Sequence, residues 1–318
     1  MSSVGTSSNE YRTITEAAGL LDRSERGKLA LSGPDGKAFL QGQVSNDVEA
    51  LSTGEGCYAA FLTPKGKMLG DLRILDSGDE LLLDTERVAL HELFNMIRRF
   101  SVGYQVELHK RTLECGLLSL VGPASDAIAR AAELPETEHV HIPVDIGESR
   151  ARAIRTDVGV DLLCDASDVE ALIAVLHDAG AAPVSEEAVE CLRIEHGRPR
   201  YGIDLDDTVM PQEAGLNERA VSFTKGCYVG QETVARLHYR GKPNRHLRGL
   251  RLSAPAVRGA QVTFEGRAVG QLGTVAVSPR FGAIALAFVR RAVPVGASVA
   301  VDSGSSDVAA EVIELPFS

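Results

Sequence analysis

Closely spaced cysteines are missing from this 318-residue sequence. Its five cysteines, at positions 57, 115, 164, 191 and 227, lie far apart, and no C-x-x-C pair occurs. A zinc ribbon and a locally encoded metal cluster are therefore excluded. Isolated thiols of this kind are typical of a reduced compartment, so we expect a cytoplasmic protein without a metal site.

Apolar stretches long enough to cross a membrane are missing as well. The longest uncharged apolar run, residues 281–289, is about half of a membrane span. Residues 1–12 contain neither the basic region nor the apolar region of a secretory signal. We therefore expect a protein that is neither exported nor associated with a membrane.

The sequence contains fewer basic than acidic residues. The 33 lysines and arginines are outnumbered by 44 aspartates and glutamates, which gives a net charge of −11. This balance argues against a broad, sequence-independent contact with nucleic acid, so we expect no direct nucleic-acid partner, although a local basic cleft is compatible with it. With 44% hydrophobic and 24% charged residues, the composition is that of a folded globular protein of about two or three domains.

The spacing of apolar residues predicts alternating strands and helices. Residues 28–33 alternate like a strand, and residues 34–44 have apolar positions at helical spacing behind a Gly-Pro turn. Residues 80–86 predict another strand, and residues 86–100 predict an amphipathic helix. The apolar face of that helix is expected to consist of Val88, Leu93, Ile97 and Phe100.

The same order recurs further along the chain. Gly122 and Pro123 precede a helical pattern as Gly33 and Pro34 do, and residues 160–176 repeat the strand followed by a helix. Ser185 is expected to cap a further helix that ends before Gly197. From residue 247 the pattern changes to short strand-like runs separated by glycine and proline, typical of a small antiparallel barrel or sandwich.

These patterns predict an α+β protein with two related tandem lobes and a C-terminal β domain. We place the first lobe at residues 11–116, the second at residues 117–243, and the β domain at residues 244–318. Residues 1–10, rich in serine and poor in apolar side chains, are expected to form a disordered tail.

Cys227 is the cysteine with a reason in the sequence to be reactive. It follows Lys225 by two residues and precedes a helix that we expect to begin near Val229. A cation and a helix N-terminus both favour thiolate over thiol. The alternative is a small, half-buried residue in a tight glycine turn.

Three further groups of residues are candidates for a site. Glu195, on the predicted helix, could accept two parallel hydrogen bonds from an amidine-like edge, although a single glutamate on a helix is usually a surface residue. The basic stretch at residues 236–248 could bind carboxylates or phosphates, or form a solvated linker. His139 and His141 could hold a metal on one strand face, but no third ligand is apparent.

The segments KGCYVGQETVAR at residues 225–236, QGQVSNDV at 41–48, KGKM at 65–68 and RIEHGRPRYGID at 193–204 together resemble the YgfZ-type folate-binding proteins. These form a branch of the glycine-cleavage T-protein (aminomethyltransferase) superfamily. The resemblance covers the chain from about residue 19 onward. It implies two α+β folate-binding lobes and a C-terminal antiparallel β-barrel around a central cavity.

The resemblance also implies a ligand and a role. The ligand is tetrahydrofolate or a one-carbon derivative of it. The role is support of iron–sulfur cluster assembly or repair, including iron–sulfur enzymes that modify tRNA, so the partners would be iron–sulfur client or assembly proteins. By the same resemblance, Glu195 binds the pterin, and Cys227 is a reactive thiol beside the folate. The residues that would complete the binding site are Lys225, Tyr228, Gln231 and Arg236.

The sequence also departs from the pattern of the T-proteins. Their paired acidic residues correspond here to Gly70 and Asp71, and their asparagine at the end of the next strand corresponds to Asp84. Three hypotheses remain: an accessory protein that uses Cys227, an aminomethyltransferase that uses Asp71 as acid or base, and a non-catalytic folate-binding scaffold.

Overall fold

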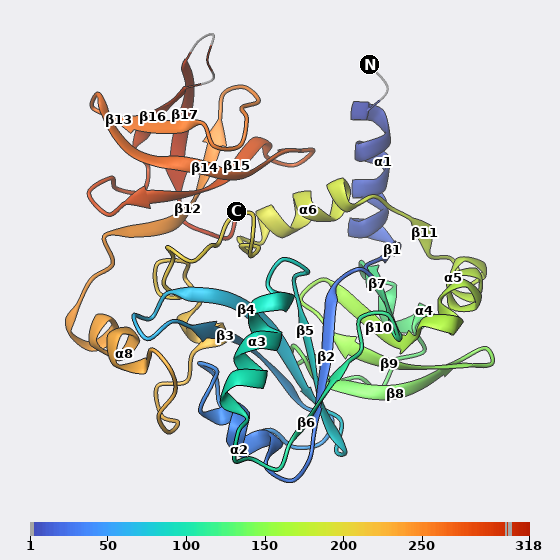
Figure 1. Ribbon diagram of the computed structural model, residues 1–318. Helices are drawn as coiled ribbons and strands as arrows, with labels where there is room; N and C mark the ends of the chain where they lie inside the picture. The colour runs from blue at the N-terminus through green and yellow to red at the C-terminus, as the bar shows by residue number, and fades with distance from the viewer. Residues whose placement is uncertain (1–2, 303, 305–306) are drawn as a thin grey trace.

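The computed structural model describes residues 3–302, 304 and 307–318. Figure 1 shows two lobes, each built on a β-sheet, below a C-terminal barrel, with helix α6 (Glu186–Glu195) between the lobes and the barrel. The predicted combination of α+β lobes and an antiparallel β-barrel is confirmed.

An antiparallel sheet of five strands, in the order β3-β4-β5-β2-β6, forms the first lobe. Two helices accompany it, α2 (Gly36–Gln41) and α3 (Leu90–Phe100). Its strands are β2 (Gly27–Ser32), β3 (Gly56–Leu62), β4 (Met68–Asp76), β5 (Glu80–Thr85) and β6 (Glu107–Lys110).

Helix α3 covers one face of the first sheet with a narrower apolar stripe than we expected. Leu93 and Ile97 are fully buried in the core of the lobe, but Val88 is 63% exposed and Phe100 is 44% exposed. Val88 lies in the turn before the helix, and Phe100 is its last residue, so neither is above the sheet. The prediction for these two residues is therefore wrong.

A six-stranded sheet in the order β11-β1-β7-β10-β9-β8 forms the second lobe. All its pairs are antiparallel except β1 with β11. The strands are β1 (Gly19–Asp22), β7 (Cys115–Val121), β8 (His141–Ile146), β9 (Ser149–Arg155), β10 (Gly159–Asp165) and β11 (Ala182–Pro183). The helical elements are α4 (Ser125–Ile128), a 3-10 turn (Ala166–Asp168) and α5 (Val169–Asp178).

Strand β1 departs from the expected division of the chain. Residues 19–22 precede the first lobe in sequence, yet they pair with β7, and Leu20 is buried in the core of the second lobe. The first lobe is therefore not a continuous segment that starts at residue 11. Apolar side chains in β1 are buried by the second sheet, which sequence order alone does not reveal.

The two lobes repeat one turn, as the sequence predicts. Gly33 after β2 and Gly122 after β7 both have positive φ, 106° and 125°. A Cβ at Gly33 would lie 2.3 Å from the carbonyl oxygen of Gln105, and one at Gly122 would lie 2.6 Å from that of Ala17. Only glycine satisfies both the conformation and the close approach.

The N-terminal segment is helical rather than a disordered tail. Helix α1 spans Ser3–Glu16, and residues 1–2 of the predicted tail lie outside the described residues. Ile14 is buried against α6, and Glu10 accepts hydrogen bonds from Ser185. The serine-rich composition of residues 1–8 favoured disorder, and the apolar contacts that stabilise the helix begin only after these residues.

The remaining helices connect the lobes to the barrel. The side chain of Ser185 caps α6 by accepting from the amide of Ala188, which confirms the predicted cap. Two more helices follow, α7 (Asn217–Ala220) and α8 (Gln231–Arg240). No helix in the described part of the chain has the length and apolarity needed to cross a lipid bilayer.

The C-terminal strands close into a six-stranded antiparallel barrel around its own apolar core. One side of the barrel contacts α6, where Ile194 joins Leu286 and Phe317 in a small shared core. Its strands are β12 (Arg245–Leu252), β13 (Gln261–Phe264), β14 (Arg267–Ser278), β15 (Gly282–Arg290), β16 (Ser298–Asp302) and β17 (Asp307–Ile313).

Candidate functional site

A polar cavity lies between the two sheets and the segment that follows α6. Side chains from β4 and β5 of the first lobe, from β7 and β10 of the second, and from α6 and residues 198–201 line it. Seven arginines and seven carboxylates are among them, so the charges of the lining balance. We call this space the central cavity, and its balanced charge suits a ligand rich in both donors and acceptors.

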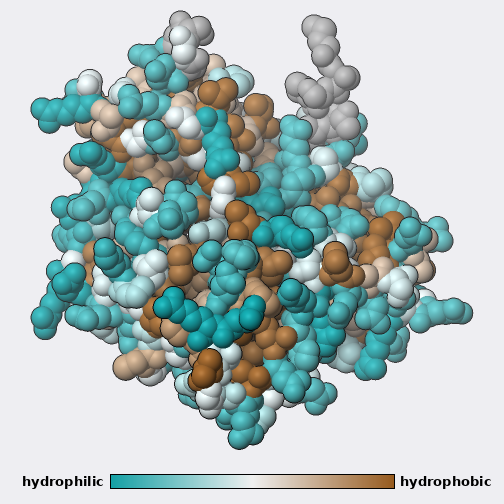
Figure 2. All heavy atoms as spheres, viewed as in Figure 1, coloured by the Kyte–Doolittle hydropathy of each residue, from teal (hydrophilic) through white to brown (hydrophobic). Residues whose placement is uncertain are grey.

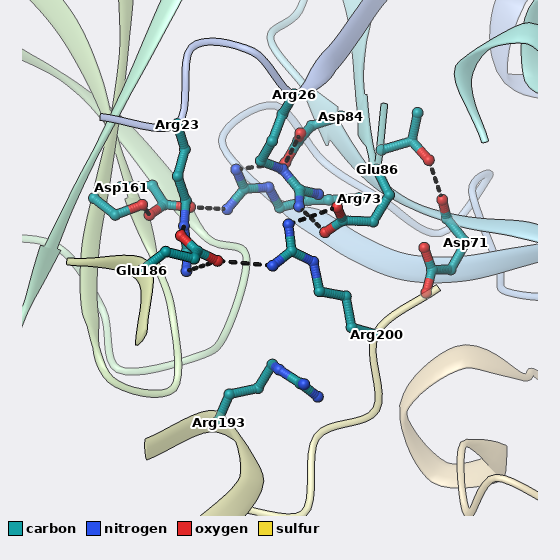
Figure 3. A network of polar contacts seen from close by, with 12 residues as sticks. Arg23, Arg26, Asp71, Arg73, Asp84, Glu86, Asp161, Glu186, Arg193 and Arg200 are labelled. Atoms are coloured by element: carbon teal, nitrogen blue, oxygen red, sulfur yellow. Dashed lines mark hydrogen bonds and ion pairs between the residues drawn. The ribbon is translucent and has the colours of Figure 1, made fainter. Parts of the chain in front are cut away.

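Ion pairs connect the lining residues into a network (Figure 3). Asp84 on β5 accepts from Arg26 and from Arg73, each at 2.8 Å. Arg26 also contacts Glu86, which in turn pairs with Arg200 at 3.1 Å. Burial raises the pKa of Asp84, but the two arginines lower it further, so that its net pKa is below the ordinary value.

Arg73 joins the two lobes across the cavity. It lies on β4 of the first lobe, and its second guanidinium nitrogen pairs with Asp161 on β10 of the second lobe at 2.8 Å. The other carboxylate oxygen of Asp161 accepts from Ser119 at 2.7 Å. A buried ion pair of this kind costs much desolvation energy and strongly fixes geometry, so it holds the lobes at a defined separation.

Asp71 is the predicted catalytic residue that the structure places in the central cavity. It lies on β4, is 6% exposed, and its Oδ2 accepts from the hydroxyl of Tyr58 at 2.6 Å. No ion pair among the described residues involves Asp71. Burial therefore dominates, and it raises the pKa of Asp71 to about 6. A carboxyl group with this pKa can both donate and accept a proton near neutral pH.

Three nitrogen atoms of the cavity lining are buried without a hydrogen-bond partner among the described residues. These atoms are Nε of Arg73, Nε of Arg219 and Nδ1 of His139. Arg219 and His139 both contact the ring of Tyr58. Burial lowers the pKa of His139 to about 4, so the ring is neutral at neutral pH. Because buried polar atoms are normally satisfied, these atoms indicate a polar ligand in this corner.

Glu195 lies outside the central cavity. Its Oε2 accepts from the hydroxyl of Tyr11 on α1 at 2.8 Å, and its Oε1 accepts from the hydroxyl of Ser278 on β14 at 2.5 Å. It lines a separate groove, which α1, α6 and Arg280 also border. In this structure Glu195 connects α1, α6 and the barrel.

Lys225 points into the first lobe and not into the central cavity. Its Nζ donates to the carbonyl oxygens of Gln41, Val44 and Asn46 at 2.6, 2.8 and 2.7 Å. These carbonyls lie at and beyond the C-terminal end of α2, so the lysine satisfies acceptors that the helix leaves free. Burial lowers the pKa of Lys225 to about 8.

The other predicted site residues near Lys225 are also outside the central cavity. Cys227 and Arg236 are exposed, Gln231 is half-buried at the start of α8, and Tyr228 is buried under the cation of Lys225. Helix α8 begins at Gln231, two residues later than we expected, with Gly230 at its N-cap. The structure therefore brings Asp71 alone of the predicted set into the cavity lining.

Three of the four segments that carry the resemblance nevertheless meet in space. Besides the contacts of Lys225 with residues 41–46, the amide of Val229 donates to the carbonyl of Gly42. Gly66, in the turn between β3 and β4, packs against α8, where a Cβ would contact Thr233. Segments 41–48, 65–68 and 225–236 thus form one structural unit at an end of the first lobe.

Sequence reasoning missed most of the residues that line the cavity. Arg73 is two residues after Asp71 on β4, and Asp161 interrupts the apolar run of β10. Charged residues at alternate positions inside apolar strands were an available signal, because such side chains are rarely buried unless they are paired. The pairing itself joins residues 88 positions apart and requires the fold.

Comparison with known proteins identifies the family. Residues 3–225 match the profile described as the GCVT N-terminal domain, and residues 245–318 match the glycine cleavage T-protein C-terminal barrel domain. The chain belongs to the GCVT family. It is thus a member of the folate-dependent aminomethyltransferase superfamily, whose aminomethyltransferases use tetrahydrofolate.

Named relatives of the GCVT family agree with this assignment. The aminomethyltransferase of Rubrobacter xylanophilus is 29% identical over 97% of this chain and 85% of its own length. A chloroplastic protein of Arabidopsis thaliana named as a transferase is 30% identical over 92% of this chain and 70% of its own length. The crystal structure of the glycine cleavage system aminomethyltransferase T from Bartonella henselae has the same fold, with a TM-score of 0.87, 23% identity, and coverage of 98% and 89%.

Proposed function

We propose that this GCVT-family protein binds tetrahydrofolate in the central cavity and carries out a one-carbon reaction there with Asp71 as the proton-transfer group. The observation that supports this most strongly is a buried carboxyl group without an ion-pair partner, whose pKa is raised to about 6 by burial. The hydroxyl of Tyr58 donates to its Oδ2 at 2.6 Å. Asp71 can then exchange a proton with a folate nitrogen as carbon is transferred.

Apart from Asp71, the proposed proton-transfer residue, the carboxylate best suited to a pterin is the one with the fewest ion-pair partners in the cavity lining. Asp84, Glu86 and Glu190 are each paired with two arginines. Asp161 is paired with Arg73 alone and otherwise accepts from a neutral hydroxyl. We therefore assign the amidine edge of the pterin to Asp161, in place of the Glu195 that the resemblance suggests.

Two variants distinguish these assignments. Asp161→Asn keeps an acceptor for Ser119 but loses the charge, and we expect it to weaken tetrahydrofolate binding by about tenfold or more in calorimetry. Glu195→Gln is the matched carboxylate-to-amide control outside the cavity and should change the affinity by less than about threefold. The reverse ranking would place the pterin in the groove beside α1.

Aminomethyl transfer itself is tested in the reverse direction by incubating the protein with 5,10-methylene-tetrahydrofolate, ammonia and a thiol acceptor, which would yield the S-aminomethyl thiol and tetrahydrofolate, and quenching the mixture chemically. We expect Asp71→Asn to bind folate nearly as well as the parent protein and to lower turnover by about a hundredfold or more. Turnover that is unaffected by the substitution would remove Asp71 from the mechanism. Folate binding without any turnover in either protein would favour a non-catalytic scaffold.

A second function, support of iron–sulfur proteins as in the YgfZ-type branch, is favoured by the position of Cys227. Its thiol is exposed on a loop that Lys225 anchors, and so is accessible to a protein partner. Burial raises the pKa of Cys57, Cys164 and Cys191 to about 12, so these thiols are much less reactive. Cys227 is thus the thiol suited to react, but on the surface and not in the cavity lining.

Two measurements test this second function. Brief treatment with iodoacetamide should modify Cys227 ahead of the other cysteines, and bound tetrahydrofolate should not protect it, because the residue does not line the cavity. Cys227→Ser should preserve folate affinity and abolish support of iron–sulfur enzyme activity in cells. Full activity of those enzymes with Cys227→Ser would leave the cysteine without a role in this function.

A further inference from the structure

A further concave surface lies on the opposite side of the first lobe from the central cavity. Leu90, Phe94 and Arg98 of α3 border it on one side, and Lys110 and Leu113, at and after the end of β6, border it on the other. Its volume is about 750 Å³. We call it the α3 groove, and nothing in the proposed folate reaction uses it.

Exposed apolar side chains are frequent in the part of the chain that contains α3 and β6, and among the described residues Leu113 is the one of them that lines the α3 groove. Five of the nine large hydrophobic residues that are exposed in the described part of the chain lie between residues 88 and 113. Leu113, in the groove itself, is 88% exposed. Figure 2 shows brown, apolar atoms on the face where Figure 1 places α3, with hydrophilic side chains lying across them. A leucine this exposed beside a groove with apolar walls is typical of an interaction surface.

The same surface carries an excess of positive charge, because Glu114 is the one acidic residue among the described lining residues and it pairs with Arg111 at 2.8 Å. Arg87, Arg98 and Lys110 line the groove, and Arg99 follows on α3. None of these four residues forms an ion pair with a described residue, in contrast to the arginines of the central cavity. Because the whole chain has a net charge of −11, a local excess of cations here is not a general property of its surface.

We propose that the α3 groove binds an acidic segment of a partner protein, distinct from the folate ligand. An apolar side chain of that segment would contact Leu90 and Leu113, while its carboxylates would pair with Arg98 and Lys110. Nucleic acid fits less well, because Arg98 and Lys110 already contact the ring of Phe94, at 5.6 and 4.8 Å from its centroid, which leaves the ring poorly available to a base. A phosphate backbone would also leave Leu113 without an apolar contact.

A synthetic peptide tests the proposal. The probe is a fluorescein-labelled twelve-residue peptide of alternating glutamate and leucine, and its binding to the full-length protein is measured by fluorescence anisotropy at two salt concentrations. We expect the affinity to fall with added salt, and the double charge reversal Arg98→Glu with Lys110→Glu to weaken it by about tenfold or more. Leu113→Ser, at a site too exposed to affect folding, should weaken it by about threefold or more.

Matched controls keep the result specific. Arg267→Glu with Arg291→Glu makes the same charge change on exposed residues of the barrel and should leave the affinity unchanged. A peptide with glycine in place of leucine should bind more weakly than the probe. Equal losses from both double reversals, or equal binding of the glycine peptide, would overturn the proposal. Equal competition by single-stranded DNA of the same charge would also overturn it, in favour of a polyanion site.

Discussion

Residue 70 shows how the alternation of side chains along a strand decides which substitutions can affect the central cavity. Asp71 faces the cavity, and Gly70 faces the opposite side, where a Cβ would lie 2.4 Å from the ring of Phe61 and 2.8 Å from Ala89. A carboxylate at position 70 would therefore enter the apolar core of the lobe in this chain. The incomplete acidic pair no longer argues against aminomethyl transfer, because the member that faces the cavity is present.

A glycine-to-alanine comparison tests this orientation. Gly70→Ala should destabilise the protein by about 2 kcal/mol or more, since a methyl group there overlaps a ring that is fully buried. Gly226→Ala is the control, because a Cβ at Gly226 meets no atom within 4 Å. Urea unfolding measures both. Equal stability of the two variants would contradict the orientation of β4 described above.

The raised pKa of Asp71 makes the stability of the protein depend on pH in a defined direction. The folded state holds the Asp71 proton more tightly than the unfolded chain does, with a pKa of about 6 against an ordinary value of 3.8. The contribution of this proton to stability is complete below about pH 4 and is lost as the pH rises through about 6. At higher pH the ionised carboxylate then costs roughly 3 kcal/mol.

Asp71→Asn removes this dependence. We expect the variant to be close to the parent protein in stability near pH 4 and more stable than it near pH 8, by up to about 3 kcal/mol. The difference between the two proteins, followed by thermal unfolding across this range, cancels the titration of the other groups. A difference that stays constant with pH would show that Asp71 does not titrate with a raised pKa.

At the scale of elements, Lys225 shows that the structural role of a residue in a family motif can depend on contacts outside the motif. A lysine two residues from a cysteine suggests a charge that activates the thiol, but its three hydrogen bonds instead join the loop before α8 to the end of α2. The partners are about 180 positions away in the sequence, so spacing within the motif contains no information about them. The N-cap of α6 was predictable for the opposite reason, because Ser185 accepts from the amide of Ala188, a neighbour in the sequence.

Substitution of Lys225 should weaken the contact between the loop before α8 and the end of α2. Lys225→Met leaves three buried carbonyl oxygens without a donor, and we expect it to lower the free energy of unfolding by about 2–4 kcal/mol. It should also make the loop that contains Cys227 more sensitive to limited proteolysis. Lys65→Met, at an exposed position in the neighbouring turn, is the control and should change neither property. An unchanged stability of Lys225→Met would show that the hydrogen bonds contribute no net free energy.

Whole elements were likewise predictable from the sequence where nearby residues determine them, and not where distant residues do. Strands with regular alternation and the capped helix α6 were predictable, since each depends on residues close together in the chain. The assignment of β1 to the second sheet and of α1 to the surface of α6 was not predictable, because both depend on partners more than 90 residues away. For the same reason, the sequence pointed to Asp71 but not to its surroundings.

At the scale of the whole molecule, Glu195 connects three parts that are remote in sequence. Its carboxylate accepts hydrogen bonds from Tyr11 on α1 and Ser278 on β14, while its own backbone carbonyl accepts from Phe317 near the C-terminus. The folded molecule thus joins its first helix, its central helix and its barrel through one side chain. The thiol of Cys191 also donates to Glu195 Oε1 at 3.6 Å, but the two hydroxyl groups are the stronger donors, so the buried carboxylate depends on both of them.

Tyr11→Phe tests this connection without altering the carboxylate. It removes one donor to Glu195, and we expect a loss of about 1–3 kcal/mol in the free energy of unfolding, with faster hydrogen exchange of amides in α1. Affinity for tetrahydrofolate should be unchanged, because neither residue lines the central cavity. Weakened folate binding in Tyr11→Phe, with α1 still protected, would indicate that this groove takes part in ligand binding.

The pairing of β1 with β7 and β11 also has a consequence for synthesis of the chain. The five strands of the first sheet are all present once residue 110 has been translated, so that sheet can form early. Residues 19–22 are made before all of them, yet they occupy a position between β7 and β11 and find their second neighbour only at residues 182–183. One of the first strands to leave the ribosome is therefore among the last to be enclosed, and until then its apolar residues are a natural binding segment for chaperones.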